Sequence, residues 1–187
     1  MDSNNKIKVL LEKDGMKFVR LEKNKYNLTY SIENKNINLE PLVNFELIKL
    51  IYELNPDIYE KVSLNKFNEE EAEITLLMKH FFDDLGIPQK YSHMTLKKIV
   101  NNNNCINFVG TSIFSEKPPF IPNGVEQLPV ENLNIECILV SPHKVTLNCL
   151  IVFHNILIIP AFIEKVMGMI VNKLFSRVKK FIENIKI

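Results

Sequence analysis

The stretch PAFIEKVMGMIVNKLFSRVKKFIENIKI, residues 160–187, predicts one long amphipathic helix. Apolar side chains recur in it at steps of three and four residues, which places them on one stripe of a 3.6-residue helix. The stripe consists of Ile163, Val166, Met167, Ile170, Leu174, Val178, Phe181 and Ile185. Because such a stripe must be removed from water, we expect this helix to cover another element of the fold.

Both ends of this stretch agree with a helix. Pro160 suits the first helical position, where its missing N–H has no partner to lose, and Glu164 lies near the positive end of the helix dipole. Cations are favoured at the other end, where the sequence has Lys173, Arg177, Lys179, Lys180 and Lys186. We therefore expect the helix to begin at Pro160.

A strand hairpin precedes this helix. Residues 134–153 alternate around Pro142-His143-Lys144, and a loop of those three residues separates apolar from polar side chains best. One face then holds Ile135, Cys137, Leu139, Leu147, Cys149 and Ile151, and the other holds Glu136, Thr146 and Asn148. Since little chain links the last strand to the helix, we expect the helix to double back across the sheet.

The chain opens with further strands. Residues 7–11 and 16–21 flank the Asp14-Gly15 pair, which favours a tight primed hairpin turn. Residues 26–32 alternate apolar and polar side chains, as in an antiparallel strand with one wet face. Three or four short strands are therefore expected before the first helix.

Two helices are expected next. Residues 42–54 have helical spacing after Pro41 and end before Asn55-Pro56. Residues 68–85 also show helical spacing, with Asn68 as the expected N-cap and Gly86 as the stop.

The remaining segment combines strands with a long irregular connection. Two runs in residues 93–114 flank the polar residues 101–104, which predict a hairpin tip. Residues 115–132 contain four prolines and an Asn-Gly pair, and should be irregular. A connection of this length is a lid, a contact loop for a protein partner, or a passive surface crossing.

The order of elements predicts an α+β protein. We expect an antiparallel sheet packed on a long C-terminal helix, with a helix pair inserted after the N-terminal strands. With 187 residues and 46% hydrophobic content, the chain is most simply a single domain, residues 1–187.

Composition excludes some function classes. The formal net charge of +1 gives no electrostatic reason to expect a nucleic-acid partner. Residues 147–169 come nearest to a membrane span but are interrupted by polar and charged side chains, so contact with membranes is at most peripheral. Three cysteines and a polar start without a signal peptide favour the cytoplasm and free thiols.

No catalytic or metal site is expected. The sequence has no nucleophile elbow, phosphate-binding loop or dinucleotide fingerprint, which argues against an enzyme and against cofactors. His80 and Asp84 are spaced to share a metal ion, yet no third ligand is identifiable. Cys137 and Cys149 face each other in the predicted hairpin, where small apolar thiols are ordinary core residues.

The C-terminal elements resemble a known superfamily. The strands IECILV and VTLNCLIVF, followed by IIPAFIEKVMGMIVNKLFSRVKKFIENI, resemble the START/Bet v 1-like superfamily with its helix-grip fold. The resemblance implies a cavity between sheet and helix that holds a lipid, a sterol or another apolar molecule. If the helix roofs such a cavity, residues on the apolar faces that meet should line it, namely Leu147, Ile151, Phe153, Phe162, Val166, Ile170 and Leu174.

Two function hypotheses follow. The first is a non-enzymatic domain that binds a lipid or other apolar ligand. The alternative is an interaction or structural subunit with a solid core and no ligand. Heavy use of Asn, Lys and Ile suggests an A/T-rich genome, such as that of a large DNA virus or a protist, and in the viral case the subunit would belong to a virus particle. An enclosed apolar cavity of about 300 to 1,000 Å³ under the helix would favour the first.

Overall fold

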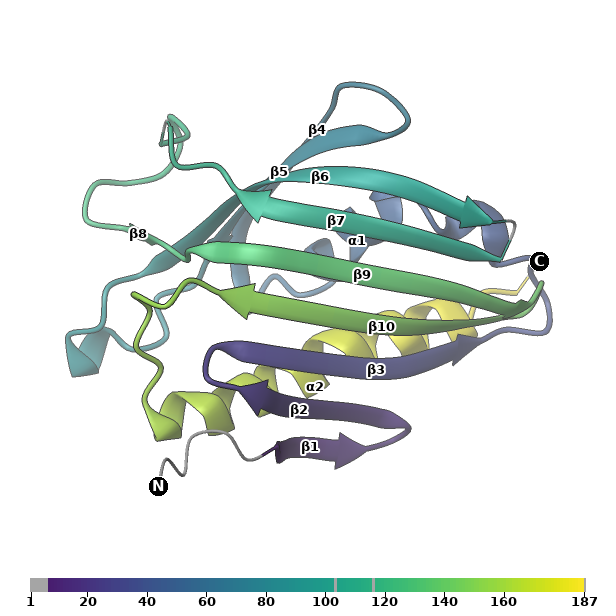
Figure 1. Cartoon of the computed structure of the whole chain (residues 1–187), viewed down its shortest axis with the longest axis horizontal. Helices are drawn as coiled ribbons and strands as arrows, with labels where there is room; N and C mark the ends of the chain where they lie inside the picture. The colour runs from purple at the N-terminus through teal and green to yellow at the C-terminus, as the bar shows by residue number, and fades with distance from the viewer. Residues whose placement is uncertain (1–6, 103, 116, 187) are drawn as a thin grey trace.

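The computed structural model describes residues 7–102, 104–115 and 117–186. Within them, ten strands form one sheet in the order β1-β2-β3-β10-β9-β7-β6-β5-β4, and the short β8 pairs with β6 beside this path. Two α-helices lie on one face of the sheet (Figure 1). This confirms the α+β class and the antiparallel sheet packed on a long C-terminal helix.

The bounds of the elements follow the order of the chain. The strands are β1 Lys8–Lys13, β2 Met16–Glu22, β3 Lys25–Glu33, β4 Tyr59–Lys66, β5 Glu71–Met78, β6 Lys90–Asn102, β7 Cys105–Ser112, β8 Glu126–Gln127, β9 Val130–Ser141 and β10 Lys144–Phe153. The α-helices are α1 Phe45–Glu53 and α2 Ala161–Glu183, and the 3-10 turns are Glu40–Leu42 and Asp83–Leu85.

The terminal helix α2 doubles back across the sheet, as expected. It contacts β1, β2, β3 and α1 (Figure 1). Pro160 is the N-cap, in extended conformation, and not the first helical residue.

The buried stripe of α2 overlaps the predicted one, since Leu174 and Val178 are buried and Met167, Ile170 and Ile185 pack against the core. Its fully buried members are Glu164, Gly168, Leu174, Val178 and Ile182, whereas Phe181 is exposed. A prediction from apolar spacing does not include Glu164 and Gly168, because glutamate is charged and glycine has no side chain.

The N-terminal expectations are confirmed. Asp14 and Gly15 have φ values of 53° and 75°, which is the conformation of a primed turn. In α1, the Asn44 side chain accepts hydrogen bonds from the backbone N–H groups of Glu46 and Leu47, at 2.8 and 3.3 Å. This N-cap starts α1 three residues later than predicted, after the 3-10 turn.

The predicted helix over residues 68–85 is wrong. The segment forms β5 and the loop after it, so one α-helix, not two, separates β3 from the next strand. Asn68 does accept hydrogen bonds from the N–H groups of Glu70 and Glu71, both at 2.8 Å, but inside the turn between β4 and β5. A side-chain oxygen can close such a turn as readily as it caps a helix.

Burial on both faces explains this error. Residues 74–77 read Ile-Thr-Leu-Leu, and all four are buried. Ile74 joins the main core, while Leu77 packs beneath Ile121 and Val125 on the other face. A strand covered on both sides loses its period of two, and a short apolar run then resembles a helix.

The hairpin of β9 and β10 has the predicted faces and a different register. Leu147 pairs with Cys137, and Cys149 pairs with Ile135. The turn is shorter than expected, since Lys144 already pairs with Ser141. Cys137 and Cys149 therefore do not face each other directly, and all three cysteines are free.

The hairpin of β6 and β7 is formed at the predicted place, although Asn103 of its tip lies outside the described residues. The irregular connection is shorter than residues 115–132, because it contains β8 and ends where β9 begins at Val130. It packs on the outer face of the sheet through Phe120, Ile121 and Val125. Residue 116 is outside the described chain.

Candidate functional site: the interior between the helices and the sheet

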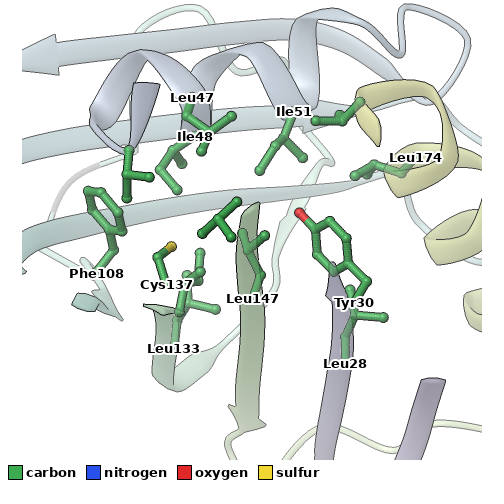
Figure 2. Packing of buried hydrophobic residues seen from close by; sticks show 14 of the residues in the cluster. Leu28, Tyr30, Leu47, Ile48, Ile51, Phe108, Leu133, Cys137, Leu147 and Leu174 are labelled. Carbon is green, nitrogen blue, oxygen red and sulfur yellow. The ribbon is translucent and has the colours of Figure 1, made fainter. Parts of the chain in front are cut away.

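The space between the helices and the sheet is filled by apolar side chains. Figure 2 shows residues of the strands, including Leu28, Phe108 and Leu133, pointing toward α1 and α2. The Phe45 ring of α1 lies 5.6 Å from the Phe108 ring of β7, and Phe175 of α2 lies 4.9 Å from Tyr30 of β3. Both helices thus share one core with the sheet.

The structure brings most of the sequence-predicted site residues together. Leu147, Phe153 and Leu174 are buried, and the half-buried Ile151 and Ile170 pack against the same core. Val166 is half-buried on α2.

Phe162 is the exception among them. It is 46% exposed, and its ring lies 6.3 Å from that of Phe82 in the loop after β5. It therefore lies at the edge of the interior and not within it.

Three buried asparagines hold the ends of α2 and the segment before it. Asn24 donates to the carbonyl oxygens of His154 and Leu157 in the linker between β10 and α2, at 3.1 and 2.8 Å. Asn34 donates to those of Ile182 and Ile185 at the C-terminal end of α2, at 2.7 and 2.9 Å.

The third asparagine joins the two helices. Asn55 follows α1 and donates to the carbonyl oxygens of Ile51, at 2.9 Å, and Leu174, at 3.4 Å. Its own side-chain oxygen accepts from Arg177 at 3.1 Å. Because buried amides and carbonyls need partners, these contacts fix the position of α2 over the sheet.

A buried charge anchors the start of α2. The Glu164 carboxylate accepts from Arg20 at 2.9 Å, from Lys8 at 3.1 Å and from the Tyr26 hydroxyl at 3.2 Å. Burial raises the pKa of Glu164, but the hydrogen bonds from Lys8 and Arg20 outweigh it and hold the pKa below its usual value. The carboxylate thus stays ionised and ties α2 to the first three strands.

The interior offers no reactive thiol. Burial raises the pKa of Cys137 and of Cys149 to about 12, so both remain protonated near neutral pH. They act as small apolar core residues.

The metal candidates of the sequence lie on a loop instead of a helix. The His80 Nε2 atom is 2.7 Å from the carbonyl oxygen of Ile87, and its Nδ1 atom is 3.6 Å from Asp83. Within the described part of the chain, no three His, Cys, Asp or Glu side chains gather in a way that could hold a metal ion.

Exposed apolar side chains gather where α2 begins. The contact between Phe82 and Phe162 joins the loop after β5 to the start of α2, and the linker from β10 leads into the same place (Figure 1). We call the exposed apolar residues of these segments the apolar rim: Phe81, Leu85, Ile156, Ile158 and Phe162. Along the chain, its linker residues follow shortly after Phe153, the buried last residue of β10.

Two surface hollows lie at the opposite end of α2. One, of about 560 Å³, is lined by Leu54, Arg177, Lys180, Phe181, Asn184 and Ile185. The other, of about 250 Å³, lies between α1 and the end of α2. Neither is lined by a strand residue, so both differ from the predicted site between helix and sheet.

Sequence reasoning missed Glu164, the three asparagines and most of the rim. The position of Glu164 was a signal, because this charged residue lies three residues before Met167 of the apolar stripe. The rim had a weaker signal, the run Ile156 to Ile159 outside any predicted element. The asparagines carry no pattern, because each acts on a distant segment.

Comparison with known sequences finds no relative: no family model and no curated protein matches this chain. In addition, no helix within the described residues is long and apolar enough to cross a membrane.

Solved structures do match the fold. The lipid transfer and protein localization domain of human StarD13 (DLC2) superposes with a TM-score of 0.69 at 8% identity, over 97% of this chain and 91% of that domain. Human StAR-related lipid transfer protein 5 gives 0.68 at 10% identity, over 97% and 88% of the two chains. A StAR-related lipid transfer protein from Xanthomonas axonopodis gives 0.63 at 9% identity, over 94% and 98%. With its long sheet and the terminal helix laid across it, this chain has the START/Bet v 1-like helix-grip fold.

Proposed function

We propose that this chain binds a lipid or another apolar molecule between α2 and the inner face of the sheet, without catalysing a reaction. The similar solved structures are named as lipid transfer proteins. We take residues 1–187 as one domain, because both helices and most strands share one core. With three free cysteines, the cytoplasm is the proposed compartment.

The observation that carries the proposal is the apolar rim. Ile158 is 81% exposed and Phe162 is 46% exposed, on the segment of chain that follows the buried Phe153. Soluble proteins rarely expose contiguous apolar groups without a function. Here the group lies where the linker, the start of α2 and the loop after β5 meet, so separation of these segments opens a path to the core.

The rim also suggests how a ligand enters. An apolar surface of this kind makes peripheral contact with a membrane, and a lipid then passes from one apolar environment to another. Each methylene group that leaves water contributes about 0.8 kcal/mol, so an acyl chain offsets the loss of contacts between α2 and the sheet. Phe162, on the edge of the site, belongs to this entrance rather than to the ligand cavity.

Uptake from vesicles tests the proposal. The protein is incubated with vesicles of a total lipid extract, separated from them, and weighed by native mass spectrometry. We expect a lipid adduct with the wild type and severalfold slower adduct formation with Ile158→Asp.

The matched control is Val100→Asp. Val100 is 61% exposed near the end of β6, away from the rim (Figure 1). It should take up lipid at the wild-type rate. If wild-type protein acquires no adduct from any vesicle, the lipid-binding proposal is wrong.

The filled core favours a second candidate, an interaction subunit without a ligand. Leu147, Leu174 and Phe108 are buried, and the two hollows described above lie elsewhere. In this case the exposed Phe114 and the segment 115–132 provide the contact to a protein partner. Such a subunit should give no lipid adduct, and Phe114→Asp should abolish its assembly.

A further inference from the structure

Tyr30 of β3 has a buried hydroxyl without a protein partner. The residue is 1% exposed, and no described atom forms a hydrogen bond with its hydroxyl oxygen. Tyr26, on the same face of the same strand, instead donates to Glu164 at 3.2 Å. Buried hydroxyl groups are nearly always paired, because an unpaired one has lost its water without compensation.

The surroundings of this hydroxyl are apolar. Figure 2 shows it pointing from β3 toward the helices, among Ile51 of α1, Leu147 of β10 and Leu174 of α2. These are the walls of the space in which we place the ligand. Burial holds the pKa of Tyr30 well above its usual value, so the hydroxyl keeps its proton and can donate it.

We propose that Tyr30 is the polar anchor of the ligand site, and that its hydroxyl donates a hydrogen bond to an uncharged oxygen of a neutral, mostly apolar amphiphile. This inference rests on the proposed function and narrows its ligand class. The rest of the ligand lies between Leu147 and Leu174, in contact with apolar side chains.

The charge of the ligand follows from the same surroundings. A buried carboxylate or phosphate group requires a paired cation, and the groups that act electrostatically on the Tyr30 hydroxyl, Cys137, Cys149 and Tyr52, include none. The buried charge of α2, Glu164, is already paired with Arg20 and Lys8. A long-chain alcohol, ketone or ester therefore fits the site, whereas an anionic lipid head group does not.

Tyr30→Phe tests this inference, with Tyr26→Phe as the matched control. Each variant loses one hydroxyl group from the inner face of β3, and Tyr30→Phe keeps the ring contact with Phe175. Binding of dodecanol and of tridecane, an alkane with as many heavy atoms, is measured by equilibrium partition of the labelled compounds. Relative to tridecane, the wild type should bind dodecanol about tenfold more tightly than a site without this hydrogen bond would.

Tyr30→Phe should lose this preference while it still binds tridecane, and Tyr26→Phe should keep it. If Tyr30→Phe retains the wild-type preference, the proposed hydrogen bond between Tyr30 and the ligand is wrong, and an internal water is the partner of Tyr30. This result leaves the lipid-binding proposal intact. Wild-type protein that binds neither compound, nor any lipid from vesicles, overturns both proposals.

Discussion

Glu164 is a single side chain of α2 that contacts Lys8 of β1, Arg20 of β2 and Tyr26 of β3. Replacement by Gln leaves Arg20 without its charged partner, so we expect Glu164→Gln to lower the free energy of unfolding by about 2 kcal/mol. Urea unfolding at neutral pH measures this loss. Glu183→Gln, a control at the half-buried end of the same helix, should change it by less than about 0.5 kcal/mol.

The effect of Glu164 should depend on pH. Its pKa in the folded protein is below the usual value of 4.5, so folding favours the ionised form. Its contribution is therefore fully present above pH 4.5 and is lost as the pH falls through the lower folded value. The difference between wild type and Glu164→Gln should shrink under acid. If the difference in unfolding free energy between the two proteins stays constant down to strongly acid pH, Glu164 is not paired with Lys8 and Arg20 as described.

Alkaline pH should destabilise the folded protein, because several cysteine and tyrosine side chains are buried in their protonated form. Burial raises the pKa of Cys137 and Cys149 to about 12, from 9.0, and also raises those of Tyr30, Tyr52 and Tyr59. The unfolded chain therefore loses these protons first, and stability should fall as the pH rises above about 9. Urea midpoints across this range measure the fall. A midpoint unchanged up to about pH 11 would show that these groups are not buried.

Single residues also show where sequence reasoning stops. The abundance of asparagine suggested only a codon bias, yet Asn24, Asn34 and Asn55 each bind at least one backbone carbonyl group far from them in the chain. A side-chain amide has no periodic pattern that reveals such a partner. The Tyr30 hydroxyl is similar, because the alternation of β3 predicts its inward direction but not the absence of a partner.

The packing of α2 on β1 depends on Gly168. A Cβ atom at this position would lie 3.1 Å from the backbone oxygen of Leu10, so the helix approaches the strand closely. Gly168→Val should lower the free energy of unfolding by about 1 to 3 kcal/mol, although valine is the better helix former.

Met169→Val is the control for this prediction. Met169 is 70% exposed one residue further along α2, and its replacement should change the free energy by less than about 0.5 kcal/mol. Chemical unfolding of both variants decides the matter. Equal midpoints would mean that α2 does not approach β1 as described.

The secondary structure of elements with one solvent-exposed face was predictable from the sequence, and that of elements buried on both faces was not. β3 and α1 follow simple periods, and both were expected close to their observed bounds. β5 is buried on both sides and was predicted as a helix. In α2, the period and most of the stripe were predicted correctly, whereas Phe181 is exposed and the buried Glu164 and Gly168 were missed.

At the scale of the whole molecule, the helix-grip resemblance was expected for about the last hundred residues, and the fold of nearly the whole chain agrees with it. The final strands and α2 determine it, and these were predicted with their order and the return of the helix across the sheet. The apolar rim was not predicted. It needs the contact of Phe82 with Phe162, which are eighty residues apart, and Phe82 lies in a loop without regular periodicity.

The central claim is that an apolar ligand lies between α2 and the inner face of the sheet. Photocrosslinking tests it most directly: the protein is loaded with a long-chain alcohol that carries a diazirine group in its chain, irradiated, digested and mapped by mass spectrometry. We predict crosslinks to Ile151 and Phe153 of β10 and to Ile170 and Leu174 of α2. Crosslinks confined to the hollow beside Phe181 and Ile185, to the outer face at Phe120, or to no residue at all would contradict the claim.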